Sequence, residues 1–291
     1  MKKIFSIIIC LFSIILLSGC TDTSTMEDIN IYTTAYPIEY IVNRLYDSHS
    51  TIRSIYPNGV DINEYKLTDV LLNEYSNDAD MFIFIGLSDE KNYLKPMLKQ
   101  NKSLKIIDVT SDISYNKAGI EELWLDPSKL LTIANNIRKG FNEYTEAKYL
   151  KNDVDKKYEE LKVDLTNLEA KYREAIKYAD NKTIIVSDDI FLFLKNYGAN
   201  VISLDSDNLE YEKNIAAART LVYSNQVRHI YLKDDENNDI INSLIEGTGV
   251  EKVSINTLST LTDDERNNYD YISLMTDNLE KIKKELYNWL H

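Results

Sequence analysis

The sequence predicts an α/β protein of two lobes, each with a mainly parallel sheet flanked by helices, joined by one long spine helix. Two observations predict the lobes: short apolar runs alternate with helical segments over residues 29–127, and the alternation resumes over residues 179–291. A third observation predicts the spine, because residues 130–178 contain no Pro and only one Gly. A chain of 291 residues is long enough for two lobes of ordinary domain size.

The first 19 residues have the order of a lipoprotein signal peptide. Two lysines precede an almost continuous apolar run over residues 4–17, which as a helix would be roughly 21 Å long, short of the roughly 30 Å core of a bilayer. Ser-Gly-Cys follows at residues 18–20. We expect cleavage before Cys20, lipid attachment to its sulfur, and a short polar tether over residues 20–28. The alternative is an ordinary signal peptide with an incidental cysteine.

Charge and composition exclude several classes of protein. The chain has 33 Lys and Arg against 47 Asp and Glu, a net charge of −14 that becomes −16 once the first 19 residues are removed. Such an acidic chain is repelled by phosphate backbones, so we expect no nucleic-acid partner. The 2 Cys exclude a disulfide framework and a zinc site built from cysteines. We expect no enzyme, since no nucleophile–His arrangement and no phosphate-binding Gly-rich loop is present.

In the N-terminal lobe, residues 29–127, strands and helices are predicted to alternate along the chain. Apolar alternation or continuous apolar runs predict strands at residues 29–32, 54–56, 80–86 and 104–109. Apolar residues at helical spacing predict helices at residues 38–46 and 67–75.

The linker region, residues 128–178, is predicted to contain the spine helix. Residues 126–128, Asp-Pro-Ser, are typical of a helix start, with Asp as the N-cap and Pro at the first helical position. Apolar residues then recur at steps of three and four at Tyr158, Leu161, Leu165, Leu168, Tyr172 and Ile176. A helix of about 30 residues would be roughly 45 Å long, the length of a spine that joins two lobes and limits their closure to a small rocking. The alternative is a solvent-exposed amphipathic helix or a coiled coil.

The C-terminal lobe, residues 179–291, repeats the pattern. We expect strands at residues 183–186, 201–204, 229–232 and 250–255. We expect helices at residues 190–197, 211–224, 239–247 and 271–290.

Five segments in order resemble the substrate-binding lipoproteins of zinc and manganese ABC importers. They are Thr-Thr-Ala-Tyr-Pro at 33–37, Tyr-Pro-Asn-Gly-Val-Asp-Ile-Asn-Glu-Tyr at 56–65, Leu-Trp-Leu-Asp-Pro at 123–127, Ser-Asp-Asp-Ile-Phe-Leu-Phe-Leu at 187–194, and Asp-Tyr-Ile-Ser-Leu-Met at 270–275. The resemblance implies a monomeric protein on the extracytoplasmic face of the cell membrane, anchored by its N-terminal lipid. It also implies that the protein delivers a divalent cation to an ABC permease and its ATPase.

The resemblance also implies four metal ligands, whose residue types differ here from the family's. Asn63, Glu122 and Asp188 stand where the family has histidines, or Glu in the third case, and Asp270 keeps an acidic residue. None of the three His of this chain falls at a ligand position.

The chemistry of these four side chains favours a hard cation. One amide oxygen and three carboxylates form an oxygen-donor set, and three converging negative charges repel one another unless a cation joins them. We therefore expect Mn²⁺ or another hard cation as cargo over Zn²⁺. The alternative is a degenerate metal site, in a surface adhesion or interaction lipoprotein or in a protein that binds a non-metal small ligand.

Overall fold

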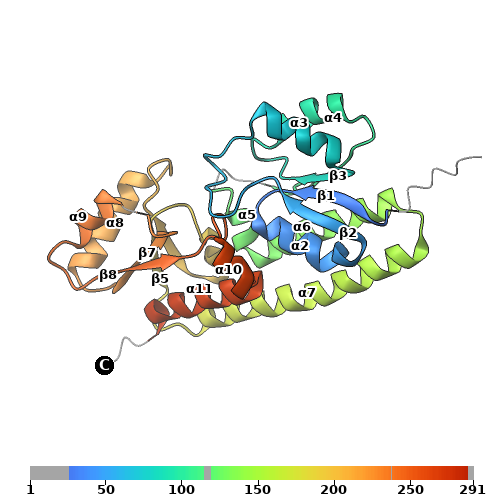
Figure 1. Ribbon diagram of the computed structural model, residues 1–291. Helices are drawn as coiled ribbons and strands as arrows, with labels where there is room; N and C mark the ends of the chain where they lie inside the picture. The colour runs from blue at the N-terminus through green and yellow to red at the C-terminus, as the bar shows by residue number, and fades with distance from the viewer. Residues whose placement is uncertain (1–25, 115–118, 237, 288–291) are drawn as a thin grey trace, which may run out of the picture.

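The computed structural model describes residues 26–114, 119–236 and 238–287 and shows two α/β lobes lying along one long helix (Figure 1). This arrangement confirms the predicted fold class. The predicted signal peptide over residues 1–19, the lipid attachment at Cys20 and the first part of the tether lie outside the described residues.

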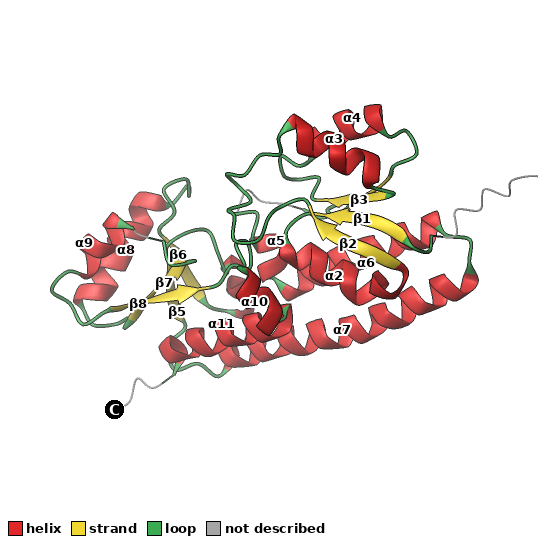
Figure 2. Cartoon of the chain, viewed as in Figure 1, coloured by secondary structure: helices red, strands yellow, loops and turns green. Residues whose placement is uncertain are grey.

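The sheet of the N-terminal lobe has four parallel strands in the order β2-β1-β3-β4. They are β1 (Ile29–Thr33), β2 (Ser50–Ser54), β3 (Met81–Phe84) and β4 (Lys105–Asp108). Helices cover both faces, which is why β3 is buried along its whole length (Figure 2). One face carries α2 (Tyr36–Tyr46) and α6 (Pro127–Tyr144), and the other carries α3 (Asp69–Asp78) and α4 (Lys91–Gln100). A short 3₁₀ turn, Asp47–His49, leads into β2.

Two features of this lobe differ from the sequence prediction. The second strand ends at Ser54, where the predicted strand begins, because the chain bends at the Ile-Tyr-Pro sequence of residues 55–57 that follows. The sequence pattern does not predict α4, which contains Pro96 in its interior. Proline lacks the N–H that a helix needs and normally argues against one.

The spine helix is α7 (Lys148–Lys177), 30 residues long, which matches the predicted length. All six residues of the predicted apolar stripe are buried on it. It follows α6, whose N-cap Asp126 accepts a hydrogen bond from the backbone N–H of Ser128 as predicted. Packing of α7 against α2 and α6 in one lobe and α11 in the other gives both lobes a common support (Figure 1).

The C-terminal lobe repeats the parallel topology, with strand order β6-β5-β7-β8. Its strands are β5 (Thr183–Val186), β6 (Asn200–Ser203), β7 (His229–Lys233) and β8 (Glu251–Ile255). Its helices are α8 (Tyr211–Tyr223), α9 (Asp239–Ile245), α10 (Asp263–Asn268) and α11 (Tyr271–Leu286). The helix predicted over residues 190–197 is instead a 3₁₀ helix, Leu192–Tyr197. Phe191 explains this difference, because its φ of 57° interrupts any helix that would begin before it.

One hydrophobic cluster runs through both lobes. It includes Ile31 and Ile83 from the first sheet, Leu165 from α7, and Ile184 and Val186 from the second sheet. A smaller cluster fills the outer part of each lobe, behind the sheet as seen from α7. The lobes are therefore joined by buried apolar contacts as well as by the chain.

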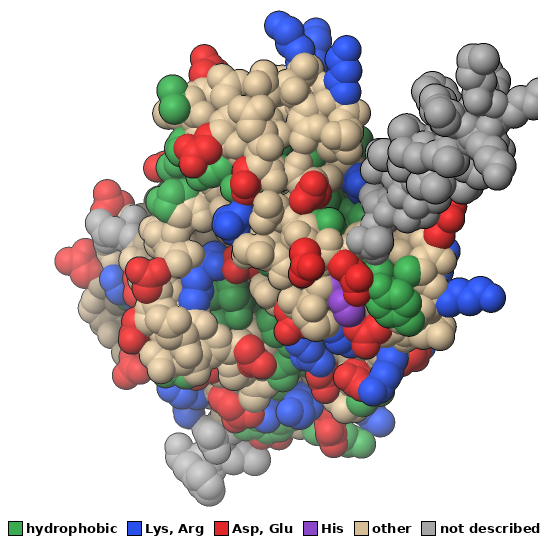
Figure 3. All heavy atoms as spheres, turned by 45° about the vertical axis from the view of Figure 1, so that its right-hand side comes forward, with side chains coloured by type: hydrophobic (Ala, Val, Ile, Leu, Met, Phe, Trp, Pro, Cys, Tyr) green, Lys and Arg blue, Asp and Glu red, His purple; other side chains and the backbone are tan. Residues whose placement is uncertain are grey.

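The helices and one face of the surface show how apolar and charged residues are distributed. No helix among the described residues has both the length and the apolar character to cross a membrane. On the face shown in Figure 3, acidic side chains are scattered among basic ones. The excess negative charge therefore does not form a single patch on that face.

Candidate functional site

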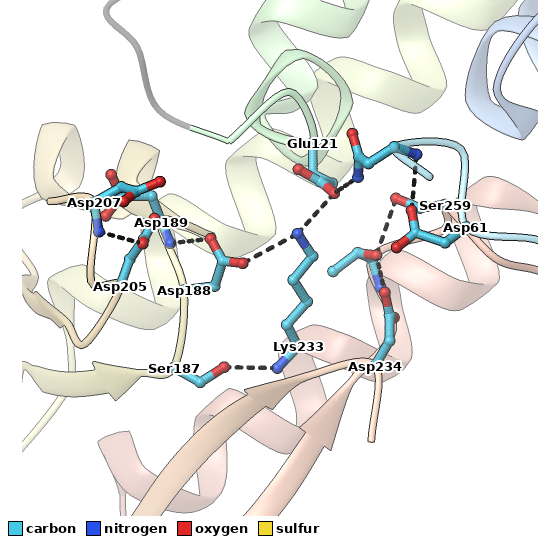
Figure 4. A network of polar contacts seen from close by, with 12 residues as sticks. Asp61, Glu121, Ser187, Asp188, Asp189, Asp205, Asp207, Lys233, Asp234 and Ser259 are labelled. Atoms are coloured by element: carbon cyan, nitrogen blue, oxygen red, sulfur yellow. Dashed lines mark hydrogen bonds and ion pairs between the residues drawn. The ribbon is translucent and has the colours of Figure 1, made fainter. Parts of the chain in front are cut away.

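A lysine joins two carboxylates from opposite lobes. Lys233 Nζ lies 2.9 Å from Glu121 Oε1 and 3.1 Å from Asp188 Oδ2 (Figure 4). Glu121 directly precedes the short helix α5 (Glu122–Leu125) of the N-terminal lobe, whereas the other two residues belong to the C-terminal lobe. We call Asn63, Glu121, Asp188 and Lys233 the interlobe cluster.

The topology of the second sheet places Lys233 and Asp188 side by side. Strands β5 and β7 are parallel neighbours, so their carboxyl ends lie at the same edge of the sheet. Lys233 is the last residue of β7, and its backbone N–H donates to Ser187 Oγ at 3.0 Å. Asp188 follows Ser187 immediately, which directs its carboxylate toward the lysine side chain (Figure 4).

Glu121 is the most buried member of the cluster, with 1% of its side chain exposed. Its Oε1 also accepts a hydrogen bond from Asn63 Nδ2 at 3.2 Å. The loop holds Asn63 in place, because its backbone N–H donates to Asp61 Oδ1 at 2.8 Å. A buried carboxylate needs a counter-charge, and Lys233 supplies it. Although burial works against the charged amine, the carboxylates of Glu121 and Asp188 raise the pKa of Lys233 above its usual value.

A second interlobe contact, between Trp124 and Thr257, borders the cluster. The Asp234 carboxylate accepts hydrogen bonds from both the backbone N–H and the hydroxyl of Thr257. The Thr257 carbonyl in turn accepts a hydrogen bond from Trp124 Nε1 at 2.8 Å. Trp124 comes from α5 and is fully buried, so it packs between the lobes. Backbone around the cluster is also crowded, since a Cβ on Gly119 would lie 3.0 Å from Glu121 Oε2.

The structure brings together two of the four predicted ligands. Asn63 and Asp188 both belong to the interlobe cluster, on opposite sides of Lys233 and Glu121. Glu122 points elsewhere: its two oxygens accept hydrogen bonds from the backbone N–H groups of Leu192 and Phe193, at 2.9 and 3.1 Å. Burial raises the pKa of Glu122 to about 7. In this structure Glu122 therefore ties α5 to the 3₁₀ helix of the other lobe.

Asp270 also lies outside the cluster. It is the N-cap of α11, where its Oδ1 accepts a hydrogen bond from the Ser273 backbone N–H at 2.8 Å and the Ser273 hydroxyl receives the Asp270 N–H. It borders a separate surface hollow with Tyr36, Tyr40 and Arg266. Within the described ranges, no group of three or more His, Cys, Asp and Glu side chains lies close enough together to hold a metal ion.

Sequence reasoning missed two members of the cluster, Glu121 and Lys233. The sequence does contain a signal for Lys233. The last residue of an apolar strand in a parallel sheet lies at the same edge of that sheet as the loop that follows the neighbouring strand. No such signal separates Glu121 from Glu122. Both are acidic and adjacent, and both contact the second lobe, but only the start of α5 decides that Glu121 is the one that reaches Lys233.

Comparison with known proteins identifies the family. The profile described as "Zinc-uptake complex component A periplasmic", ZnuA, matches residues 31–285. The chain belongs to this family.

Two relatives of known sequence align with almost the whole of this chain. The zinc-binding lipoprotein AdcA of Streptococcus pneumoniae strain R6 is 23% identical over 310 residues, which covers 98% of this chain and 61% of AdcA. The chain thus spans less than two thirds of the length of that relative. A metal ABC transporter substrate-binding lipoprotein of Lactococcus lactis is 25% identical, and 98% of each chain is covered.

Solved structures share the fold. The metal-dependent lipoprotein YcdH of Bacillus subtilis superposes with a TM-score of 0.74 at 20% identity, covering 89% of this chain and 99% of that one. The Zn(II)-bound ZnuA-like domain of Streptococcus pneumoniae AdcA gives 0.73 at 22% identity, covering 89% and 99%. These likenesses agree with the two-lobed architecture that the sequence predicts.

Proposed function

We propose that this ZnuA-family chain is the substrate-binding component of a metal ABC importer, a carrier and not an enzyme. It captures a divalent cation between its lobes and delivers it to a permease driven by an ATPase. The observation that carries this proposal is the interlobe cluster, in which one carboxylate from each lobe contacts a single positive charge. A site that holds an ammonium group between carboxylates of two lobes has the negative charge and the position needed to bind a metal ion.

The donor atoms available support a hard cation. Glu121 and Asp188 offer carboxylate oxygens, and Asn63 offers an amide oxygen once its side chain rotates away from its present hydrogen bond. Oxygen donors suit Mn²⁺, Mg²⁺ and Ca²⁺, whereas Zn²⁺ sites use imidazole and thiolate more often. We therefore propose Mn²⁺ as the preferred cargo, although the relative AdcA is named a zinc-binding lipoprotein.

The N-terminal features extend the proposal to location. Cleavage before Cys20 and lipid attachment there would leave a monomer on the extracytoplasmic face of the membrane, joined to its first strand by a tether of residues 20–28. We keep the predicted division into lobes of residues 29–127 and 179–291 with a linker of residues 128–178 as part of this proposal.

Calorimetry and thermal melting test the proposed function. The full chain, purified in detergent and stripped of metal with a chelator, is titrated with Mn²⁺, Zn²⁺, Ca²⁺ and Mg²⁺. We expect Mn²⁺ to bind most tightly, and at 100 times its Kd to add about 2.7 kcal/mol to the free energy of unfolding. No response to any of the four ions would refute metal capture and favour an adhesion role or a non-metal ligand. A tighter response to Zn²⁺ would refute the hard-cation preference alone.

Single substitutions decide which residues hold the ion. We expect Asp188→Asn and Glu121→Gln to weaken Mn²⁺ binding at least tenfold, because each removes a charged ligand. Glu64→Gln is the matched control, since it removes an exposed carboxylate from the loop that carries Asn63. Loss of binding in Glu122→Gln and Asp270→Asn, with normal binding in Glu121→Gln, would instead support the ligand set predicted from the resemblance.

A further inference from the structure

Lys233 occupies the position where a cation would join the lobes. Its ammonium contacts Glu121 of one lobe and Asp188 of the other at ion-pair distance, and only 22% of its side chain is exposed. Most lysines keep a mobile ammonium in water, and exposed pairs contribute little to stability. This lysine is different, because its partner Glu121 is almost completely buried.

The surrounding contacts fix both ends of the lysine. Its backbone is held at the end of β7 by the hydrogen bond to Ser187 Oγ. The carboxylate of the neighbouring Asp234 accepts two hydrogen bonds from Thr257, so it does not compete for the ammonium. The backbone N–H of Asp189 donates to Asp188 Oδ1 at 2.6 Å, which leaves Oδ2 directed at the lysine. The positive charge is therefore placed between the lobes by several independent contacts.

We infer that Lys233 is the resident cation of the interlobe cluster: its ammonium ties the lobes together without metal, and a divalent ion must displace it to bind. This inference rests on the proposed function. Two carboxylates and one ammonium leave the cluster with a single net negative charge, whereas removal of the ammonium leaves two. A divalent ion is attracted more strongly to the second state, and it is repelled by the lysine in the first. The lysine thus acts as a built-in competitor that weakens metal binding and favours release.

Substitution of the lysine tests the competition. In the full chain in detergent, stripped of metal, we expect Lys233→Met to bind Mn²⁺ at least tenfold more tightly than the unmodified chain by calorimetry. Lys233→Arg keeps the charge and should not gain affinity. Lys252→Met is the matched control, because Lys252 lies on the neighbouring strand β8 and contacts Asn242 instead of the cluster. We expect its affinity to be unchanged.

The same variants report on the tie between the lobes. Without metal, Lys233→Met leaves Glu121 buried without its counter-charge, so we expect a lower melting temperature than that of Lys252→Met. Saturating Mn²⁺ should restore the loss in Lys233→Met, since the metal replaces the missing charge.

A measurement on the unmodified chain avoids any variant that fails to fold. The rate of acetylation at the Lys233 amine, followed by mass spectrometry, should rise when Mn²⁺ is added, because a displaced ammonium leaves its two carboxylates. Lys252 serves as the internal reference. An unchanged or slower rate at Lys233 would overturn the inference, as would equal or weaker Mn²⁺ binding by Lys233→Met, and both would leave the proposed function intact. Absence of binding by any of these chains to any of the four ions would instead refute the proposed function and this inference together.

Discussion

Glu90 is a buried acidic side chain in the N-terminal lobe, with 3% of its surface exposed. Its Oε2 accepts a hydrogen bond from the Ile85 backbone N–H at 2.7 Å, and its Oε1 accepts one from the Tyr56 hydroxyl at 3.2 Å. These contacts connect the loop after β3 to the loop after β2, which carries Asn63. Burial raises the pKa of Glu90 to about 8 from an ordinary value of 4.5.

This raised pKa predicts that the protein loses stability as the pH rises. The folded state binds the Glu90 proton more tightly than the unfolded state, so the contribution is fully present below pH 4.5 and is lost as the pH rises through about 8. A tenfold difference in proton affinity is worth about 1.4 kcal/mol, so the loss amounts to a few kcal/mol. We expect Glu90→Gln to reduce the difference in unfolding free energy between pH 5 and pH 9, measured by urea denaturation of the metal-free chain. An equal pH dependence in both chains would contradict the assignment to Glu90.

At the scale of elements, the contact between α6 and β4 depends on one glycine. Gly140 lies in α6, and a Cβ placed on it would be 2.5 Å from Ile107 Cδ1 and 2.7 Å from Ile107 Cγ1. Glycine normally weakens a helix interior by up to about 1 kcal/mol relative to alanine. Here the missing side chain lets the helix approach the sheet closely, and overpacking costs about 1–3 kcal/mol. The packing effect therefore outweighs the helix propensity.

We accordingly expect Gly140→Ala to lower the unfolding free energy by about 1–2 kcal/mol in urea denaturation. Ile107→Val, added to Gly140→Ala, should recover part of the loss because it removes the nearest carbon. Gly249→Ala is the control, since no atom lies within 4 Å of its added Cβ. A Gly140→Ala chain as stable as the control would show that Ile107 moves aside without cost.

Sequence patterns predicted most of the helices and strands but not all residues of the interlobe cluster. Apolar periodicity located β3 and the stripe of α7 because burial in this fold follows directly from those patterns. It failed for α4, where Pro96 contradicts local propensity and tertiary packing prevails, and for the 3₁₀ helix after Phe191, whose left-handed backbone has no sequence signature. Only Asn63 and Asp188 of the interlobe cluster were predicted, because candidate ligands can be aligned to the motifs of a family. The ion pairs of Lys233 depend instead on the way the two lobes meet.

At the scale of the whole molecule, the two lobes share buried structure. The hydrophobic cluster that includes Leu165 of α7 extends into both sheets, and α7 lies along both lobes without interruption. Glu122 adds polar contacts across the same boundary, through the backbone of Leu192 and Phe193. A large opening would expose these apolar side chains and leave a buried carboxylate without its donors, and both changes cost free energy.

We therefore expect metal binding to move the lobes relative to each other by no more than about 2 Å, the scale at which packed helices slide. Spin labels at Val70 on α3 and at Leu209 before α8, exposed by 74% and 104%, report this distance by pulsed electron resonance. Both cysteines of the chain lie in its first 20 residues, so a form that begins at Met26 carries no competing thiol. Zn²⁺ is the ion of choice for this measurement, because Mn²⁺ is paramagnetic. A distance change several times larger would show that the shared core is broken on binding, and that α7 bends or separates from one lobe.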